Sequence, residues 1–148
     1  MDSAGVIRDG DVLVVGERIE AVGKNLQVPE GTIEIDASDG ILMPGMIDTH
    51  RHMWQTTMRG YGGDWSLSQY FVFYYLSWGK LFRPQDIFAG NLLGAIEAID
   101  SGVTTTLDWS HGLQTTEHAE AALEALKAVP ASYQKLVEIG RASCRERV

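Results

Sequence analysis

Two histidines separated by one residue, His50 and His52, are the side chains in this sequence best suited to hold a metal ion. They read as the end of a β-strand, and because side chains alternate along a strand, both imidazoles should point the same way. Neutral imidazole binds zinc, iron, nickel and copper, and a catalytic zinc site commonly takes about three protein ligands plus water. Taken alone, however, the pair fits ordinary surface or core histidines better than metal ligands.

The segment that carries the pair has clear local signals. Residues 46–50 predict a buried strand, which follows a Pro44–Gly45 turn. Residues 51–64 have mixed composition with several glycines and predict a long loop, and long loops inside compact domains are usually functional. The aromatic stretch 66–81 predicts a helix, although tyrosine, phenylalanine and valine also favour strands.

The next elements alternate between helix and strand. A helix should begin at Pro84, carry apolar residues at helical spacing and end before Gly102. The β-branched run 103–108 then predicts a strand, and 116–128 predicts a second helix. Strand, helix, strand, helix is the order of parallel βαβ units.

The first forty residues favour strands and turns instead. Residues 12–15 and 18–22 predict two strands joined by a two-residue hairpin turn at Gly16–Glu17. The alternation of polar and apolar residues in 18–22 predicts that one face of this strand is buried. Residues 32–35 alternate in the same way and predict a third strand.

Composition excludes several classes of protein. The chain has 148 residues, is 45% hydrophobic and carries a net charge of −8, which argues against disorder and against nucleic-acid binding. Its single cysteine excludes an internal disulfide and a cysteine-based zinc site. We see no targeting or membrane-spanning segment and expect a cytoplasmic protein.

Residues 43–52, which read MPGMIDTHRH, resemble the metal-binding signature of the amidohydrolase superfamily. The Gln and Arg-Gly pattern in 55–60 is similar to the branch that contains cytosine deaminases and triazine hydrolases. Further similar segments are 10–14, 18–23 and 35–37. The resemblance covers residues 5–130, and the chain is identified as a member of that family.

This resemblance implies a fold. The fold class is α/β: an incomplete (β/α)8 barrel of the TIM type, whose first two β/α units occupy 43–138. Part of a small β-sandwich, residues 1–42, would precede it. His50 and His52 would then lie at the carboxyl end of the first barrel strand, which is the catalytic face of such barrels.

It also implies an activity. His50 and His52 would be ligands of one divalent metal, with zinc expected first and iron second. Metal-activated hydroxide would hydrolyse a carbon–nitrogen bond of a small-molecule substrate, as in the deamination of a ring or an amidine-like compound. The other ligands and the catalytic residues would follow later in a longer, homo-oligomeric protein.

Two alternatives to deamination remain open. One is a triazine-type hydrolase that removes chloride or an alkylamine. The other is a non-catalytic barrel relative that serves as an assembly subunit, although the presence of both His50 and His52 argues against it.

Several other residues are candidates for a supporting role. Gln55 and His111 are candidate substrate-binding residues, from the loop after the first strand and the end of the second. Asp48 is either a carboxylate that orients an imidazole or a buried carboxylate bonded to the backbone. We expect Arg59 to pair with a structural carboxylate and His118 to be solvated.

The tryptophans and the aromatic stretch are expected mainly to pack. For Trp54 and Trp65, packing is favoured over lining a pocket. The aromatic residues of 70–78 would cover the barrel mouth or a subunit contact, with core packing as the simpler interpretation.

The last residues, 139–148, differ from the rest of the chain. They read IGRASCRERV and resemble the translation of a common sequencing-library adapter. We therefore expect these residues not to belong to the native fold, and we expect the chain to be a fragment of a longer protein. A fragment with two ligands and an open sheet should bind zinc weakly, hydrolyse nothing and be poorly soluble.

Overall fold

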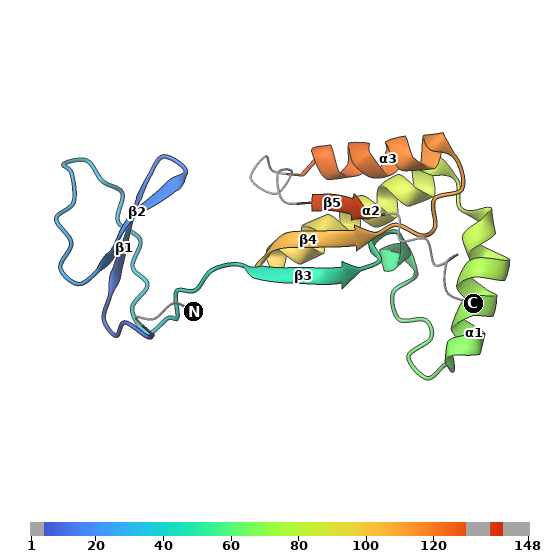
Figure 1. Cartoon of the computed structure of the whole chain (residues 1–148), viewed down its shortest axis with the longest axis horizontal. Helices are drawn as coiled ribbons and strands as arrows, with labels where there is room; N and C mark the ends of the chain where they lie inside the picture. Colours follow the sequence, from blue (N-terminus) through green and yellow to red (C-terminus); the bar gives the residue numbers. More distant parts are fainter. Residues whose placement is uncertain (1–4, 130–136, 141–148) are drawn as a thin grey trace. The chain divides into compact units, whose positions relative to one another are not determined.

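The computed structural model describes residues 5–129 and the backbone of residues 137–140. The chain divides into two compact units, Met1–Leu42 and Met43–Val148 (Figure 1). No helix among the described residues has both the length and the apolar character needed to cross a membrane.

The first unit is built on a β-hairpin. Strands β1 (Asp11–Val15) and β2 (Arg18–Gly23) pair antiparallel, with Val15 opposite Arg18 across a two-residue turn. Gly16 in that turn has a φ of +62°, a conformation that glycine adopts without strain. The predicted strands and hairpin turn are confirmed.

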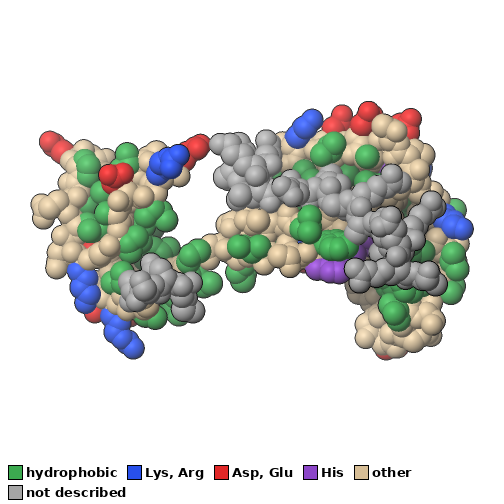
Figure 2. All heavy atoms as spheres, in the orientation of Figure 1, with side chains coloured by type: hydrophobic (Ala, Val, Ile, Leu, Met, Phe, Trp, Pro, Cys, Tyr) green, Lys and Arg blue, Asp and Glu red, His purple; other side chains and the backbone are tan. Residues whose placement is uncertain are grey.

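Two predictions for this unit are wrong. Residues 32–35 form no strand, and Ile33 and Ile35 are 88% and 87% exposed. The alternating residues of β2 bury no face either, since Ile19 is 67% exposed. Alternation produces burial only when another layer covers the strand, and the described residues of this unit provide none. Figure 2 shows the resulting hydrophobic side chains at its surface.

The second unit is a parallel sheet with helices. Its strands, in spatial order, are β3 (Met46–Arg51), β4 (Val103–Trp109) and β5 (Val137–Gly140). Helix α2 (Pro84–Asp100) connects β3 to β4, and α3 (Thr116–Lys127) follows β4. The predicted strand–helix–strand–helix order and its parallel pairing are confirmed. Figure 2 shows acidic side chains along the outside of α3.

The resemblance of the chain's end to an adapter stays a prediction. Ile139 and Gly140 form the end of β5. The rest of that segment, 141–148, lies outside the described residues.

Strand β3 differs from expectation in its burial. It was predicted to be buried, but Ile47 is 69% exposed, because only β4 pairs with it among the described residues. The predicted turn at Pro44–Gly45 is also absent. Gly45 instead allows the chain to pass close to Thr104, since a Cβ at Gly45 would lie 2.1 Å from Cγ2 of Thr104.

The segment between β3 and α2 is more ordered than the sequence suggested. The first part of the predicted loop is a 3-10 helix, η1 (Met53–Met58), whose Met53 and Trp54 are 0% and 1% exposed. The predicted helix over 66–81 is confirmed in an irregular form. It consists of α1 (Leu67–Phe71), a π-helical turn η2 (Val72–Ser77) and a 3-10 turn η3 (Trp78–Leu81).

The core of this unit lies where α2 packs against η1 and α3. Buried residues of one cluster include Met53, Ala95 and Leu126, and those of the other include Trp54 and Ile87. Both clusters contain a residue of η1, so the turn after the histidine pair is part of the core.

His118 corrects another expectation. It lies in the first turn of α3 and was predicted to be solvated, but it is 7% exposed. One ring nitrogen, Nε2, is 2.9 Å from the carbonyl oxygen of Phe82, and Nδ1 is 2.8 Å from Oγ1 of Thr115. The histidine thus joins α3 to the segment before α2, a contact that local sequence pattern does not reveal.

Two glycines of α2 let η1 approach the helix closely. A Cβ on Gly90 would lie 2.5 Å from the carbonyl oxygen of Trp54, and a Cβ on Gly94 would lie 2.8 Å from Oγ1 of Thr56. A separation under about 3 Å is not found for real Cβ atoms, so a Cβ on Gly90 would displace the η1 backbone, whereas a Cβ on Gly94 would require the Thr56 side chain to move.

We predict that Gly90→Ala destabilises the chain. Alanine favours a helix over glycine by about 1 kcal/mol, but the overlap with the Trp54 backbone costs about 1–3 kcal/mol. Gly63→Ala is the control, because a Cβ at Gly63 meets open space. Urea unfolding should show a loss for Gly90→Ala and little change for the control. A gain in stability for Gly90→Ala would contradict the close contact.

Helix α2 begins at Pro84, as predicted, and the Asp86 side chain caps its N-terminus. One carboxylate oxygen of Asp86 accepts the backbone N–H of Arg83 at 2.8 Å, and both oxygens accept from its guanidinium at 3.0 Å. These hydrogen bonds, that of the guanidinium foremost, lower the pKa of Asp86.

We predict that Asp86→Ala lowers the free energy of unfolding by about 1 kcal/mol near neutral pH, as loss of a cap does. Because the pKa of Asp86 is lower in the folded chain, its contribution is present above the ordinary value of about 4 and is lost as the pH falls through the lowered value. Urea unfolding near pH 7 and near pH 3 checks this. If the free energies of unfolding of the wild-type chain and Asp86→Ala differ by the same amount at both pH values, the prediction is wrong.

Candidate metal centre

The two histidines predicted to bind a metal lie side by side at the end of β3. Nε2 of His50 is 3.2 Å from Nε2 of His52, so both rings point the same way as the strand period requires. In a tetrahedral zinc site with Zn–N bonds of about 2.0–2.1 Å, two ligand nitrogens lie about 3.3 Å apart. The separation of the two nitrogens therefore fits a shared metal ion.

The orientation of His52 is fixed by the neighbouring strand. Its Nδ1 lies 2.8 Å from the carbonyl oxygen of Trp109, at the end of β4. A carbonyl only accepts hydrogen bonds, so Nδ1 carries the proton and Nε2 of the neutral ring keeps its lone pair. A histidine that donates through its other nitrogen to a carbonyl is the usual arrangement of a metal ligand.

Trp109 also holds His50. Its indole stacks on the His50 ring with centroids 4.8 Å apart and an interplanar angle of 10°. The indole N–H donates to the carbonyl oxygen of Thr49 at 3.0 Å. Trp109 was not predicted as a site residue, although a parallel register of the two strands would have placed it beside the histidine pair.

His111 lies next to His52. Their ring centroids are 4.3 Å apart, and Nδ1 of His111 lies 2.9 Å from the same Trp109 carbonyl oxygen. The Tyr75 ring stacks on it with a centroid distance of 4.6 Å. Burial of the imidazole lowers the pKa of His111 to about 4. His111 is therefore neutral near pH 7, with Nε2 free to accept a hydrogen bond.

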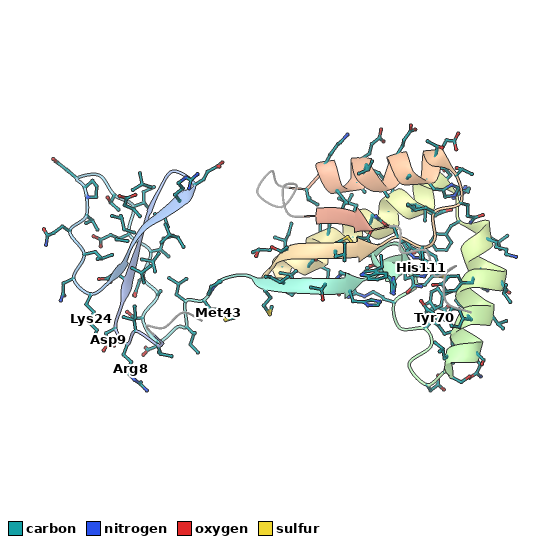
Figure 3. The ribbon with its side chains drawn as sticks, in the orientation of Figure 1. Arg8, Asp9, Lys24, Met43, Tyr70 and His111 are labelled. Atoms are coloured by element: carbon teal, nitrogen blue, oxygen red, sulfur yellow. The ribbon has the colours of Figure 1, made fainter. Side chains whose placement is uncertain are left out.

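Gln55, the other predicted substrate-binding residue, contacts His111 directly. Its side-chain nitrogen is 3.4 Å from Nε2 of His111 and donates to the Tyr70 hydroxyl at 2.7 Å. Figure 3 shows Tyr70 on α1 and His111 at the end of β4 on the same side of the unit. The structure thus brings His50, His52, Gln55 and His111 into one cluster. Tyr70 was missed because nothing distinguishes it from its aromatic neighbours in the sequence.

Asp108 lies behind this cluster and is fully buried. It accepts hydrogen bonds from the backbone N–H of Met53 at 3.0 Å, from the Asn91 amide at 3.2 Å and from the Ser110 hydroxyl. Burial raises the pKa of Asp108, while these donors, Ser110 first, act in the opposite direction. The carboxylate thus fixes the residue after His52 to the end of β4. Oδ1 of Asn91 has no partner among the described residues.

Asp48 was predicted either to orient an imidazole or to be a buried carboxylate bonded to the backbone, and the structure agrees with the second role only in its backbone contact. Its carboxylate accepts the backbone N–H of His50 at 3.1 Å and contacts Arg51 at 3.3 Å. It contacts the backbone rather than an imidazole, but its side chain is 27% exposed rather than buried.

Other candidates are structural. Trp54 packs edge-on against Tyr74 and Phe82, as predicted. Arg59 pairs with a carboxylate, that of Glu97, also as predicted.

The described residues supply part of a metal site. Among residues 5–129, no three His, Cys, Asp or Glu side chains are grouped so that they could hold a metal ion. The histidine pair therefore provides two nitrogen donors of the right chemistry and spacing, fewer than the roughly three protein ligands of most catalytic zinc sites.

Comparison with known proteins gives consistent matches. A sequence model of the amidohydrolase family matches residues 41–145. A 5-methylthioadenosine/S-adenosylhomocysteine deaminase of Pyrococcus furiosus is 34% identical over 123 residues, which cover 83% of this chain and 28% of the relative. A 5'-deoxyadenosine deaminase of Methanosarcina acetivorans is 30% identical over 119 residues, covering 80% of this chain and 27% of the relative.

A solved structure has a similar fold. A mutant of the atrazine chlorohydrolase TrzN from Arthrobacter aurescens TC1, in complex with zinc and atraton, aligns with a TM-score of 0.72 at 24% identity. The alignment covers 85% of this chain and 30% of that one. The chain thus spans less than a third of the length of these proteins.

We predict that His111 stays neutral in the metal-free chain from neutral pH down to a pH of about 4, because burial disfavours the imidazolium. NMR of the His111 ring during an acid titration measures this. Titration with a midpoint near the ordinary histidine value of about 6.5 would contradict the buried, neutral ring.

Proposed function

The chain belongs to the amidohydrolase family, and we propose that it is the part of a metal-dependent hydrolase that supplies two ligands of the metal. The observation that carries the proposal is the 3.2 Å separation of Nε2 of His50 and Nε2 of His52. The Trp109 carbonyl supports it by fixing the His52 tautomer that presents a lone pair. Retention of this arrangement argues against a purely structural relative.

His50 and His52 would hold the metal, and zinc is the ion we propose. Imidazole suits several divalent ions, but the aligned structure with a similar fold is a zinc complex. When bound, a divalent metal of this kind makes water a usable nucleophile near neutral pH.

We propose that the reaction of the whole protein is hydrolysis of a carbon–nitrogen bond, with deamination of a ring or amidine-like compound as the first candidate. Two of the similar proteins are deaminases of adenosine derivatives. The alternative is a triazine-type hydrolase, which the structural match to an atrazine chlorohydrolase favours.

The chain's own residues would bind the polar edge of such a substrate. Gln55 uses its amide N–H groups on Tyr70 and His111, which leaves its carbonyl oxygen as an acceptor. The Tyr70 hydroxyl accepts from Gln55 and keeps its proton to donate. Together they present one acceptor and one donor beside the histidine pair. Neutral His111 contributes no charge, which suits an uncharged polar substrate.

We predict that the 148-residue chain binds zinc weakly and hydrolyses neither adenosine derivatives nor triazines, because its described residues supply two nitrogen donors. Competition with a chromophoric chelator measures the dissociation constant. His50→Ala and His52→Ala should each abolish the binding.

His118→Gln is the matched control, since His118 bonds Phe82 and Thr115 away from the pair. It should keep the wild-type affinity. Zinc binding that survives His50→Ala and His52→Ala would contradict the assignment. Turnover by the chain alone would contradict the view that it holds an incomplete site.

A further inference from the structure

The side of α2 that faces η1 carries three residues at helical spacing: Gly90, Gly94 and Glu97. Gly90 and Gly94 allow η1 to approach the helix closely. Glu97 continues the same stripe toward the end of the helix and forms charged contacts to the segment that carries His52 and Gln55. The proposed reaction does not use these contacts of Glu97.

Glu97 bridges two arginines. One oxygen of its carboxylate accepts from Arg51 at 3.2 Å, and the other accepts from Arg59. The Arg51 side chain is 23% exposed and also contacts Asp48 at 3.3 Å. Four side chains, two of each sign, thus form one network between β3, the end of η1 and α2.

The position of Arg51 explains why this network bears on the metal pair. Arg51 lies between His50 and His52, and strand alternation sends its side chain to the opposite side from theirs. Arg59 directly follows η1. One carboxylate therefore holds both ends of the segment 51–59, which contains His52 and Gln55.

An isolated surface ion pair contributes little to stability. The Glu97 and Arg59 side chains are 37% and 62% exposed, but Arg51 is half-buried, and the two contacts of Glu97 together close a loop. Its main effect is expected on where the loop lies rather than on whether the chain folds. The Asp108 contact to Met53 fixes the same loop from the other side.

We infer that Glu97 is a positioning residue for the metal pair: by holding Arg51 and Arg59 it sets the distance between His50 and His52. This rests on the proposed metal site. Outer partners of metal ligands typically contribute about 10–100-fold in affinity. Glu97 acts through the loop rather than on an imidazole, so we expect about tenfold.

The test is the zinc dissociation constant of the full chain. Glu97→Gln should raise it about tenfold, and Glu124→Gln, at an exposed position on α3, should not change it. Asp86→Ala should lower stability without changing zinc affinity, because Asp86 caps the opposite end of α2. Arg59→Gln should weaken binding, whereas Arg59→Lys, which keeps the charge, should restore most of it.

The outcomes separate this inference from the proposed site. If His50→Ala abolishes zinc binding but Glu97→Gln leaves it at the wild-type value, the inference is wrong and the site stands. If Asp86→Ala weakens binding as much as Glu97→Gln, the effect is general destabilisation and the inference is wrong. If the wild-type chain binds no zinc through its histidines, the proposed metal site and the inference about Glu97 are both wrong. Should Glu97→Gln not fold, equal affinities of Arg59→Gln and Arg59→Lys would overturn the inference.

Discussion

The parallel pairing of β3 with β4 is the constraint on which the candidate site depends. Arg51 lies opposite Asp108 in the register, so the residues that follow each strand emerge side by side. Nδ1 of His52 then lies within hydrogen-bond distance of the Trp109 carbonyl oxygen, and so does Nδ1 of His111. One carbonyl thereby sets the tautomers of two histidines. A shift of the β3 register by one residue would move the His50 and His52 rings to the other face of the sheet, away from Trp109 and His111.

Helix α2 holds the segment after β3 against the end of β4. Its glycines admit η1 at backbone distance, and its Asn91 reaches the buried carboxylate of Asp108. A buried carboxylate is costly unless it is hydrogen-bonded, and here the Met53 backbone, Asn91 and Ser110 supply the donors. The polar group under the site is therefore satisfied by the elements it joins. Packing, backbone pairing and charge all act on the short segment after His52.

The sequence predicted the elements whose signals are local. Strand alternation placed both histidines on one side, and Pro84 and Gly102 marked the limits of α2. The prediction failed where the outcome depends on a partner: residues 32–35 lack a covering layer, and His118 is buried by contacts to distant residues. The same holds for the site. Residue type and position predicted His50, His52, Gln55 and His111. Trp109 and Asp108 act through contacts made only after the strands pair, and Tyr70 acts through its contact with Gln55.

The central claim is that His50 and His52 present their Nε2 lone pairs to one metal ion, with the His52 ring held by the Trp109 carbonyl. Long-range ¹H–¹⁵N NMR of the histidine rings tests it most directly. The metal-free chain should show His52 protonated at Nδ1 and not at Nε2, and added zinc should shift the Nε2 resonances of His50 and His52 together. A His52 ring protonated at Nε2, or zinc that moves only one of the two resonances, would contradict the account.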